Sequence, residues 1–238
     1  MWLICSSIGK KLIMSITGIC LILFLTFHML MNLVVIFSPE AYNMVCAMLG
    51  ANWYALIATK GLAFLALVHI VYAFVLYFNN KKARGNDAYA VTSRPKEVEW
   101  ASQNMLALGI VIAAFLVLHM FHFWAKMQLV EVQHMLGMVG DNDPAFLNAT
   151  NGAYHIANTF SNPVIVILYL VALGALWFHL THGFWSALQT MGINNEKWFS
   201  RWRCIGNIYV TILILGFALV VVTFFIKSLL PCATACPV

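Results

Sequence analysis

The stretch PVIVILYLVALGALWFHLTHGFWSAL (residues 163–188) contains no charged residue and is long enough to cross a bilayer as one helix. Crossing takes roughly 20 apolar residues at about 1.5 Å of rise each. Two histidines, His179 and His182, nevertheless lie inside this run. An imidazole in hydrocarbon costs free energy unless it is bound, so each of these rings needs a partner or a ligand.

Four more apolar runs have the same character, at 12–37, 54–78, 105–124 and 205–230. The chain of 238 residues is 63% hydrophobic and 9% charged, against about 25% charged residues in soluble domains. The first run is too long for a removable signal peptide and is not followed by a small-residue cleavage site. We therefore predict an all-α membrane protein, with residues 1–238 forming one bundle of five transmembrane helices.

The basic residues indicate an orientation rather than a nucleic-acid surface. Ten of the 13 Lys and Arg flank the same ends of the predicted helices: Lys10, Lys11, Lys81, Lys82, Arg84, Arg94, Lys96, Lys197, Arg201 and Arg203. By the positive-inside rule the N-terminus is cytoplasmic and the C-terminus is outside. They form no basic patch with interleaved aromatics, so no nucleic-acid partner is expected. Cys232 and Cys236 would then lie outside, where an oxidising compartment could pair them, or leave them as free thiols.

Four consecutive runs carry histidine: His28, His69, His119 with His122, and His179 with His182. By helix rise, His28 and His119 lie about 24 and 21 Å from the inner ends of their helices. His69 and His179 each lie about 14 Å from the inner end. Depth alone does not separate two histidines three residues apart on one helix. The sequence thus predicts an outer and an inner pair of imidazoles.

Small residues recur at a fixed distance from two of these histidines. Gly18 lies ten residues before His28, and Gly109 lies ten residues before His119, which favours His119 over His122. Glycine lets a helix approach a neighbouring helix or a flat ligand closely.

Two facing imidazoles without a companion carboxylate or thiolate are typical of a b-type haem held at both axial positions. Zinc or a di-iron centre takes three or four ligands in one cluster, and the apolar runs contain no Asp or Glu. Proton-relay transporters also use intramembrane carboxylates. Two bis-histidine haems, one above the other, are the arrangement that the pattern favours.

Several segments together resemble the cytochrome b558 family, the di-haem membrane anchors of succinate dehydrogenases and fumarate reductases. They are SSIGKKLIMSITGICLILFLTFHMLMN, PEAYNMVCAMLG, LVLHMFHFW, and HLTHGFW followed by SALQTMGI. The resemblance covers essentially the whole chain. It implies that His69 and His179 bind the iron of a proximal haem b and that His28 and His119 bind that of a distal one. His122 and His182 would be second-sphere or haem-edge groups, although either could replace its neighbour as the ligand.

The family also implies partners and a location. Its members transfer electrons between an iron-sulfur subunit, which is bound to a flavoprotein subunit on the cytoplasmic face, and menaquinone in a bacterial cytoplasmic membrane. A dimer of this three-subunit complex is compatible with the resemblance. This chain has no dinucleotide fold or Cys cluster of its own for the dicarboxylate chemistry. Ser15, where the family places a hydroxyl, and Lys11, one turn away, are candidates to bind a haem propionate.

Quinone chemistry couples electrons to protons, so an acid is expected near the distal haem. Glu40 is the leading candidate for this catalytic role, with Glu131 and Asp141 behind it. Some menaquinol-oxidising fumarate reductases have a Glu two residues before the ligand on the fourth helix. Trp177 stands there in this chain, so a proton path along that helix is not expected. Two alternatives stay open: a di-haem anchor of formate dehydrogenase or nitrate reductase type, and a haem-free transporter that uses His.

Overall fold

The computed structural model describes residues 6–84, 100–193 and 195–230 of the chain. Over these residues it is all α-helical and without strands, as predicted. Five helices are long and apolar enough to span a membrane, so the chain is a multi-pass membrane protein. They are α2 (Ser7–Phe37), α4 (Trp53–Arg84), α6 (Met105–His122), α10 (Pro163–Thr190) and α11 (Glu196–Leu229).

The predicted runs mark the apolar parts of these helices, and α2 and α11 begin at polar caps outside those parts. α2 begins at Ser7, five residues before the predicted run, because the Ser6 side chain accepts a hydrogen bond from the Gly9 N–H at 2.9 Å. α11 begins at Glu196 after Asn195, whose side chain accepts from the Trp198 N–H. Capping residues are polar, so a hydropathy pattern does not include them.

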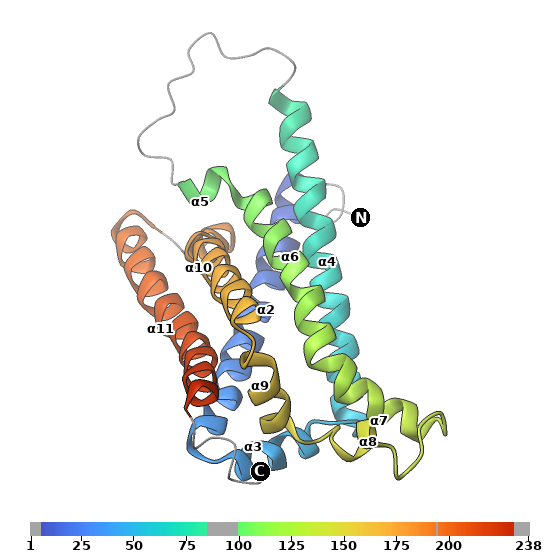
Figure 1. Cartoon of the computed structure of the whole chain (residues 1–238). Coiled ribbons are helices and arrows are strands. Elements are labelled where there is room, and N and C mark those ends of the chain that lie inside the picture. Colours follow the sequence, from blue (N-terminus) through green and yellow to red (C-terminus); the bar gives the residue numbers. More distant parts are fainter. Residues whose placement is uncertain (1–5, 85–99, 194, 231–238) are drawn as a thin grey trace.

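The five long helices run alternately up and down, with α2 in contact with α4, α10 and α11 (Figure 1). α6 packs against α10 and α4, and α10 packs along α11. We call the end where α2 begins and α4 ends the inner end, and the opposite end the outer end, after the orientation that the charges predict. The short helix α5 (Trp100–Gln103) lies at the inner end (Figure 1).

Short elements gather at the outer end. They are α3 (Pro39–Met48), η1 (Trp124–Lys126), α7 (Gln128–Met135), α8 (Pro144–Leu147) and α9 (Gly152–Phe160) (Figure 1). α9 contacts α3, α10 and α11, and α7 leaves the end of α6 sideways. The bundle is therefore covered at the outer end by its own chain.

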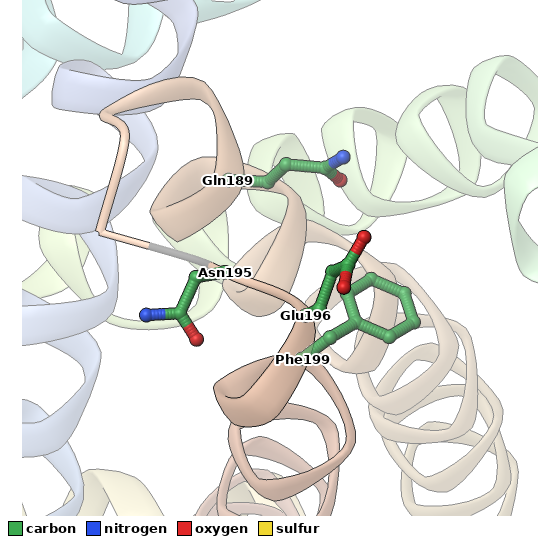
Figure 2. Close-up of a pocket in the computed structure, with 4 residues that line it drawn as sticks. All are labelled: Gln189, Asn195, Glu196 and Phe199. Atoms are coloured by element: carbon green, nitrogen blue, oxygen red, sulfur yellow. The ribbon is translucent and has the colours of Figure 1, made fainter.

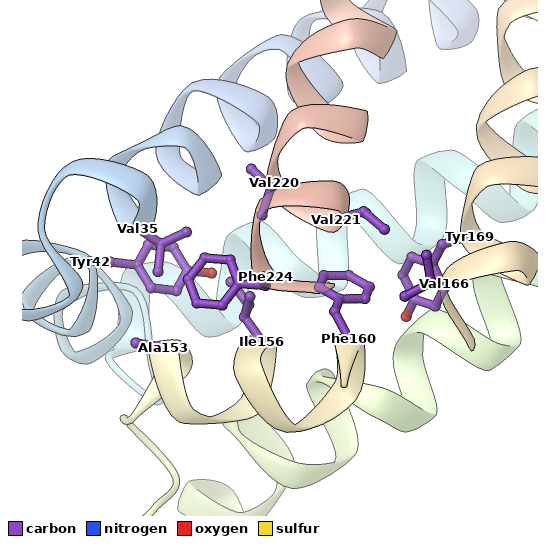
Figure 3. Packing of buried hydrophobic residues seen from close by; sticks show 10 residues of the cluster. All are labelled: Val35, Tyr42, Ala153, Ile156, Phe160, Val166, Tyr169, Val220, Val221 and Phe224. Carbon is purple, nitrogen blue, oxygen red and sulfur yellow. The ribbon is translucent and has the colours of Figure 1, made fainter. Parts of the chain in front are cut away.

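A hydrophobic cluster joins α9 to the outer halves of α2, α10 and α11. Figure 3 shows Ile156 and Phe160 of α9 packed beside Phe224 and Val221 of α11. Tyr169 of α10 also belongs to this cluster and is 4% exposed. A second cluster, with Ile22, Leu180 and Leu213 among its members, joins the same three long helices nearer the middle.

Candidate functional site

The structure brings the four histidines together as the two pairs that helix depth predicts. The rings of His28 and His119 lie 5.8 Å apart between centroids, with an interplanar angle of 89°. The rings of His69 and His179 lie 6.4 Å apart, at 66°. The outer pair thus joins α2 to α6, and the inner pair joins α4 to α10.

The helices α6 and α10 each carry a second histidine, and the ring of that histidine has a different neighbour. His122 Nδ1 lies 3.0 Å from the Tyr169 hydroxyl, and the two rings are stacked at 5.8 Å. The His182 ring meets the edge of Trp185 at 5.0 Å. His119 and His179 thus each lie beside a histidine of another helix, whereas the rings of His122 and His182 contact Tyr169 and Trp185.

The inner pair is oriented by Thr17, a residue that the sequence analysis did not single out. Thr17 Oγ1 lies 3.0 Å from His69 Nδ1 and 2.9 Å from the Ile13 carbonyl oxygen. A hydroxyl has one proton, and when Thr17 donates it to that carbonyl its lone pair can accept the His69 Nδ1–H. This tautomer leaves the Nε2 lone pair of His69 available to a metal.

Two of the facing imidazoles have a nitrogen without a hydrogen-bond partner anywhere in the described part of the chain. They are His119 and His179, whose Nδ1 atoms are both buried. On the outer pair, the Asn32 amide donates to the His28 carbonyl at 2.8 Å and lies 3.5 Å from His28 Nε2, the long limit of a hydrogen bond. Buried polar atoms without a hydrogen-bond partner are rare, so these two nitrogens require an explanation.

Aromatic rings surround the outer pair. Phe24 stacks on His28 at 5.4 Å, Phe217 lies 5.8 Å from it, and Phe123 lies 5.2 Å from His119. Such a shell excludes water and competing ligands. Within the described residues, no group of three or more His, Cys, Asp and Glu side chains is placed to hold a metal ion. Each pair therefore supplies two nitrogens and no further side-chain ligand of these four types.

The two predicted glycines lie beside the inner pair. A Cβ added to Gly18 would lie 3.3 Å from His69 Cε1, and one added to Gly109 would lie 4.0 Å from His179 Cε1. Because Gly18 is level with the inner pair and precedes His28 by ten residues, the two pairs are about 15 Å apart along α2. α6 repeats this arrangement with Gly109 and His119.

The pairs meet the basic geometric requirement of a bis-histidine haem. Imidazole nitrogens bind first-row metals at about 2 Å, so an iron between two rings sets their centroids about 6 Å apart. The observed separations are 5.8 and 6.4 Å. If the chain binds haem, each pair would supply two imidazole ligands to its iron.

Polar groups near the inner end differ in whether they are already hydrogen-bonded within the protein. Ser15 is buried, and its hydroxyl donates to the Lys11 carbonyl at 3.0 Å, while the Lys11 side chain is exposed. The indole N–H groups of Trp185 and Trp202 are buried without a partner in the described residues. They are additional candidate donors to an anion.

Trp177 is part of the helix packing. Its indole N–H donates to Thr211 Oγ1 of α11 at 2.9 Å. Trp177 therefore links α10 to α11 through a side-chain hydrogen bond.

The predicted acids all lie at the outer end, in different surroundings. Glu40 is exposed, and its own backbone N–H and the Ser38 hydroxyl hold the pKa of its carboxyl below the usual value. Glu131 is half-buried, accepts a hydrogen bond from the Ala51 N–H and touches Gly50. Burial raises the pKa of Glu131, and the Ala51 N–H offsets part of that rise. Asp141 is exposed and lies 2.7 Å from His134 Nε2.

A shallow pocket of about 440 Å³ opens at the inner end, between the end of α10 and the start of α11. It is lined by Gln189, Asn195, Glu196 and Phe199, of which Asn195 also caps α11 (Figure 2). None of these residues belongs to a histidine pair. Cys232 and Cys236, with their predicted pairing, lie outside the described residues.

Comparison of the chain with protein-family models, with curated proteins and with solved structures returned no match.

Proposed function

We propose that this chain is a di-haem b membrane anchor that carries electrons between an iron-sulfur subunit and menaquinone, as in succinate dehydrogenases and fumarate reductases. The observation that carries the proposal is the pairing of four histidines from four helices into two facing sets, at 5.8 and 6.4 Å. The family's motifs in the sequence support the choice of partner enzyme.

His28 and His119 would hold one haem iron, and His69 and His179 the other. A haem held in this way supplies reversible one-electron chemistry. The protein positions the rings: Thr17 accepts from His69 Nδ1, and Phe24 stacks on His28. Gly18 and Gly109 have no side chain to project toward the inner pair, so the helix surface there leaves space for a flat macrocycle.

Propionate groups are anions and require donors at the inner end. Lys11 and Ser15 are the sequence-based candidates, and the buried indole N–H groups of Trp185 and Trp202 join them. The Ser15 proton is already donated to a backbone carbonyl, so this hydroxyl is the weaker donor of the set.

The quinone would react at the outer end, beside the His28 and His119 pair. A proton acceptor works best when its pKa is close to the operating pH. Burial moves the pKa of Glu131 in that direction, whereas hydrogen bonds move that of Glu40 away from it. Glu40, Glu131 and Asp141 all stay in the proposal, and on this ground we place Glu131 ahead of Glu40.

The flavoprotein and iron-sulfur subunits would bind at the inner end. Exposed basic and aromatic side chains are present there: the Arg201 guanidinium lies 5.0 Å over the Trp198 ring at the start of α11. A di-haem anchor of formate dehydrogenase or nitrate reductase type would share the haem sites and differ in this surface. Identification of the subunits that co-purify with the chain separates the two readings.

Replacement of single histidines by alanine tests the haem assignment. We expect His69→Ala or His179→Ala to lose one haem and to weaken assembly with the soluble subunits, and His28→Ala or His119→Ala to lose the other haem. The measurement is haem per chain, with the absorption spectrum of each purified variant.

His122→Ala and His182→Ala are matched controls on the same helices, because their rings meet Tyr169 and Trp185 rather than a facing histidine. Both should retain two haems. A colourless wild-type protein would support the transporter reading, and a facing-pair variant with both haems would show that the ligand set is wrong.

A further inference from the structure

Four large apolar side chains are exposed between the last residue of α7 and the last residue of α8, at the outer end. Met135 is 58% exposed, Leu136 69%, Met138 70% and Leu147 65%. We call these four residues the apolar tip. Single exposed apolar residues are common on protein surfaces, whereas four within 13 residues are a local concentration of apolar surface.

The loop that carries the tip is held in one conformation. His134 Nε2 lies 2.7 Å from Asp141 Oδ1, and the His134 ring stacks on Phe146 at 3.6 Å and 10°. The turn passes through Gly137 at φ +70°, and the Met138 N–H donates to the Gln133 carbonyl at 2.9 Å. Glycine adopts a positive φ of this kind more readily than other residues do. The tip is therefore presented by a defined turn.

The hydrogen bonds of α7 define its level along the bundle. Gln128 Nε2 donates to the Gly50 carbonyl at 2.9 Å, and the Ala51 N–H donates to Glu131. Gly50 and Ala51 lie three and two residues before Trp53, where α4 begins, and Trp53 is 74% exposed. Exposed tryptophans at the ends of membrane helices lie at the level of the lipid headgroups. α7 is thus tied to the chain at that same level.

We propose that the apolar tip inserts into the headgroup and upper acyl region of the outer leaflet beside α4. The lipid-facing surface of α4 continues from Trp53 to Ile57, which is 63% exposed, and α7 extends sideways from the bundle at its outer end (Figure 1). Asp141 is exposed on the return of the loop, and it keeps that side in water. Amphipathic segments bind to a membrane interface in this way, with their apolar residues in the lipid and their charged residues in water. This inference does not depend on the haem proposal.

Photo-cross-linking in lipid tests the proposal. The full chain, with whichever subunits co-purify with it, carries p-benzoylphenylalanine at Leu136 and is reconstituted in phosphatidylcholine vesicles. The matched control carries the same photoprobe at Asn142, an exposed polar position on the same loop. After illumination, mass spectrometry identifies the adducts.

We expect a phosphatidylcholine adduct at position 136 with a yield several-fold above that at position 142. Equal yields at the two positions would overturn the proposal. So would an adduct that joins position 136 to a second copy of this chain or to a co-purified subunit, because the tip would then be a protein interface. Retention of the wild-type elution volume and helical content shows that each labelled variant is folded.

Discussion

At the scale of single residues, the two histidines of the inner pair differ in their second sphere. His69 Nδ1 lies 3.0 Å from Thr17 Oγ1, whereas His179 Nδ1 is buried and has no partner in the described residues. A hydrogen bond to the far nitrogen of a ligating imidazole raises its basicity and fixes its orientation. Thr17 is therefore a positioning residue for the inner pair.

Thr17→Val removes the hydroxyl and keeps the shape of the side chain. If the inner pair holds a haem, the less basic His69 will stabilise ferric iron less well. The midpoint potential of that haem should then rise by on the order of tens of millivolts. Redox titration of the purified protein, followed by absorption spectroscopy, measures this shift.

Thr17→Ser is the matched control, since it retains the hydroxyl and should keep the wild-type potential. Equal potentials in the Val and Ser variants would mean that Thr17 does not tune the site, whereas the absence of haem from both would count against the haem proposal itself.

At the scale of the elements, glycines allow α11 to approach its neighbours closely. A Cβ added to Gly206 would lie 2.6 Å from Phe184 Cδ1 of α10, and one added to Gly216 would lie 2.6 Å from Met29 Sδ of α2. Helices in a membrane associate through such close packing, because lipid is as apolar as their side chains. These contacts hold the helix without histidines against the helices that carry them.

Gly206→Ala is expected to destabilise the protein, because the aromatic ring of Phe184 must move to admit the methyl group. Overpacking of this kind costs about 1–3 kcal/mol. The expected result is a lower midpoint of thermal unfolding in detergent.

Gly174→Ala, in the middle of α10, is the control, since a Cβ at Gly174 would meet nothing within 4 Å. Its unfolding midpoint should stay close to that of the wild type. A Gly206→Ala midpoint equal to that of the control would contradict the tight α10–α11 contact.

At the scale of the whole molecule, the outer end is closed by α3, α7, α8 and α9. Two of the proposed proton acceptors, Glu40 and Glu131, lie within that cover. Glu131 links α7 to the turn before α4, while Glu40 faces outward from the first turn of α3. The cover thus places a half-buried carboxyl near the end of the bundle that holds the outer histidine pair.

Glu131→Gln keeps the size of the side chain and an oxygen for the Ala51 N–H, and removes the titratable proton. If Glu131 accepts the quinol proton, it acts as a carboxylate, so the rate falls as the pH drops through its raised pKa. We expect the variant to retain both haems and to lose most of its menaquinol oxidation, together with that limb of the pH profile. Quinol oxidation by the isolated complex, measured against pH, checks this.

Glu40→Gln is the comparison, because hydrogen bonds lower the pKa of Glu40, whereas burial raises that of Glu131. This variant should leave the pH profile of quinol oxidation nearly unchanged. The reverse result, with loss in Glu40→Gln alone, would restore Glu40 as the acceptor.

The amino-acid order was sufficient for the properties that depend on composition and periodicity. Apolar runs of bilayer length predict the five spans, and helix rise predicts that His28 matches His119 in depth and His69 matches His179. The ring contacts at 5.8 and 6.4 Å have these same partners. Depth is a local property of one helix, so it could be calculated without knowledge of the packing.

Some residues that are in contact are not related by any periodicity of the sequence. These contacts can be seen only in the folded structure. Thr17 meets His69 because α2 packs against α4 in one rotational setting, and His122 turns to Tyr169 because that ring fills the space beside it. Gly50 lies against the side chain of Glu131, which belongs to α7. A hydropathy pattern specifies how deep a residue lies in the membrane, whereas the azimuth of each helix follows from side-chain packing against its neighbours.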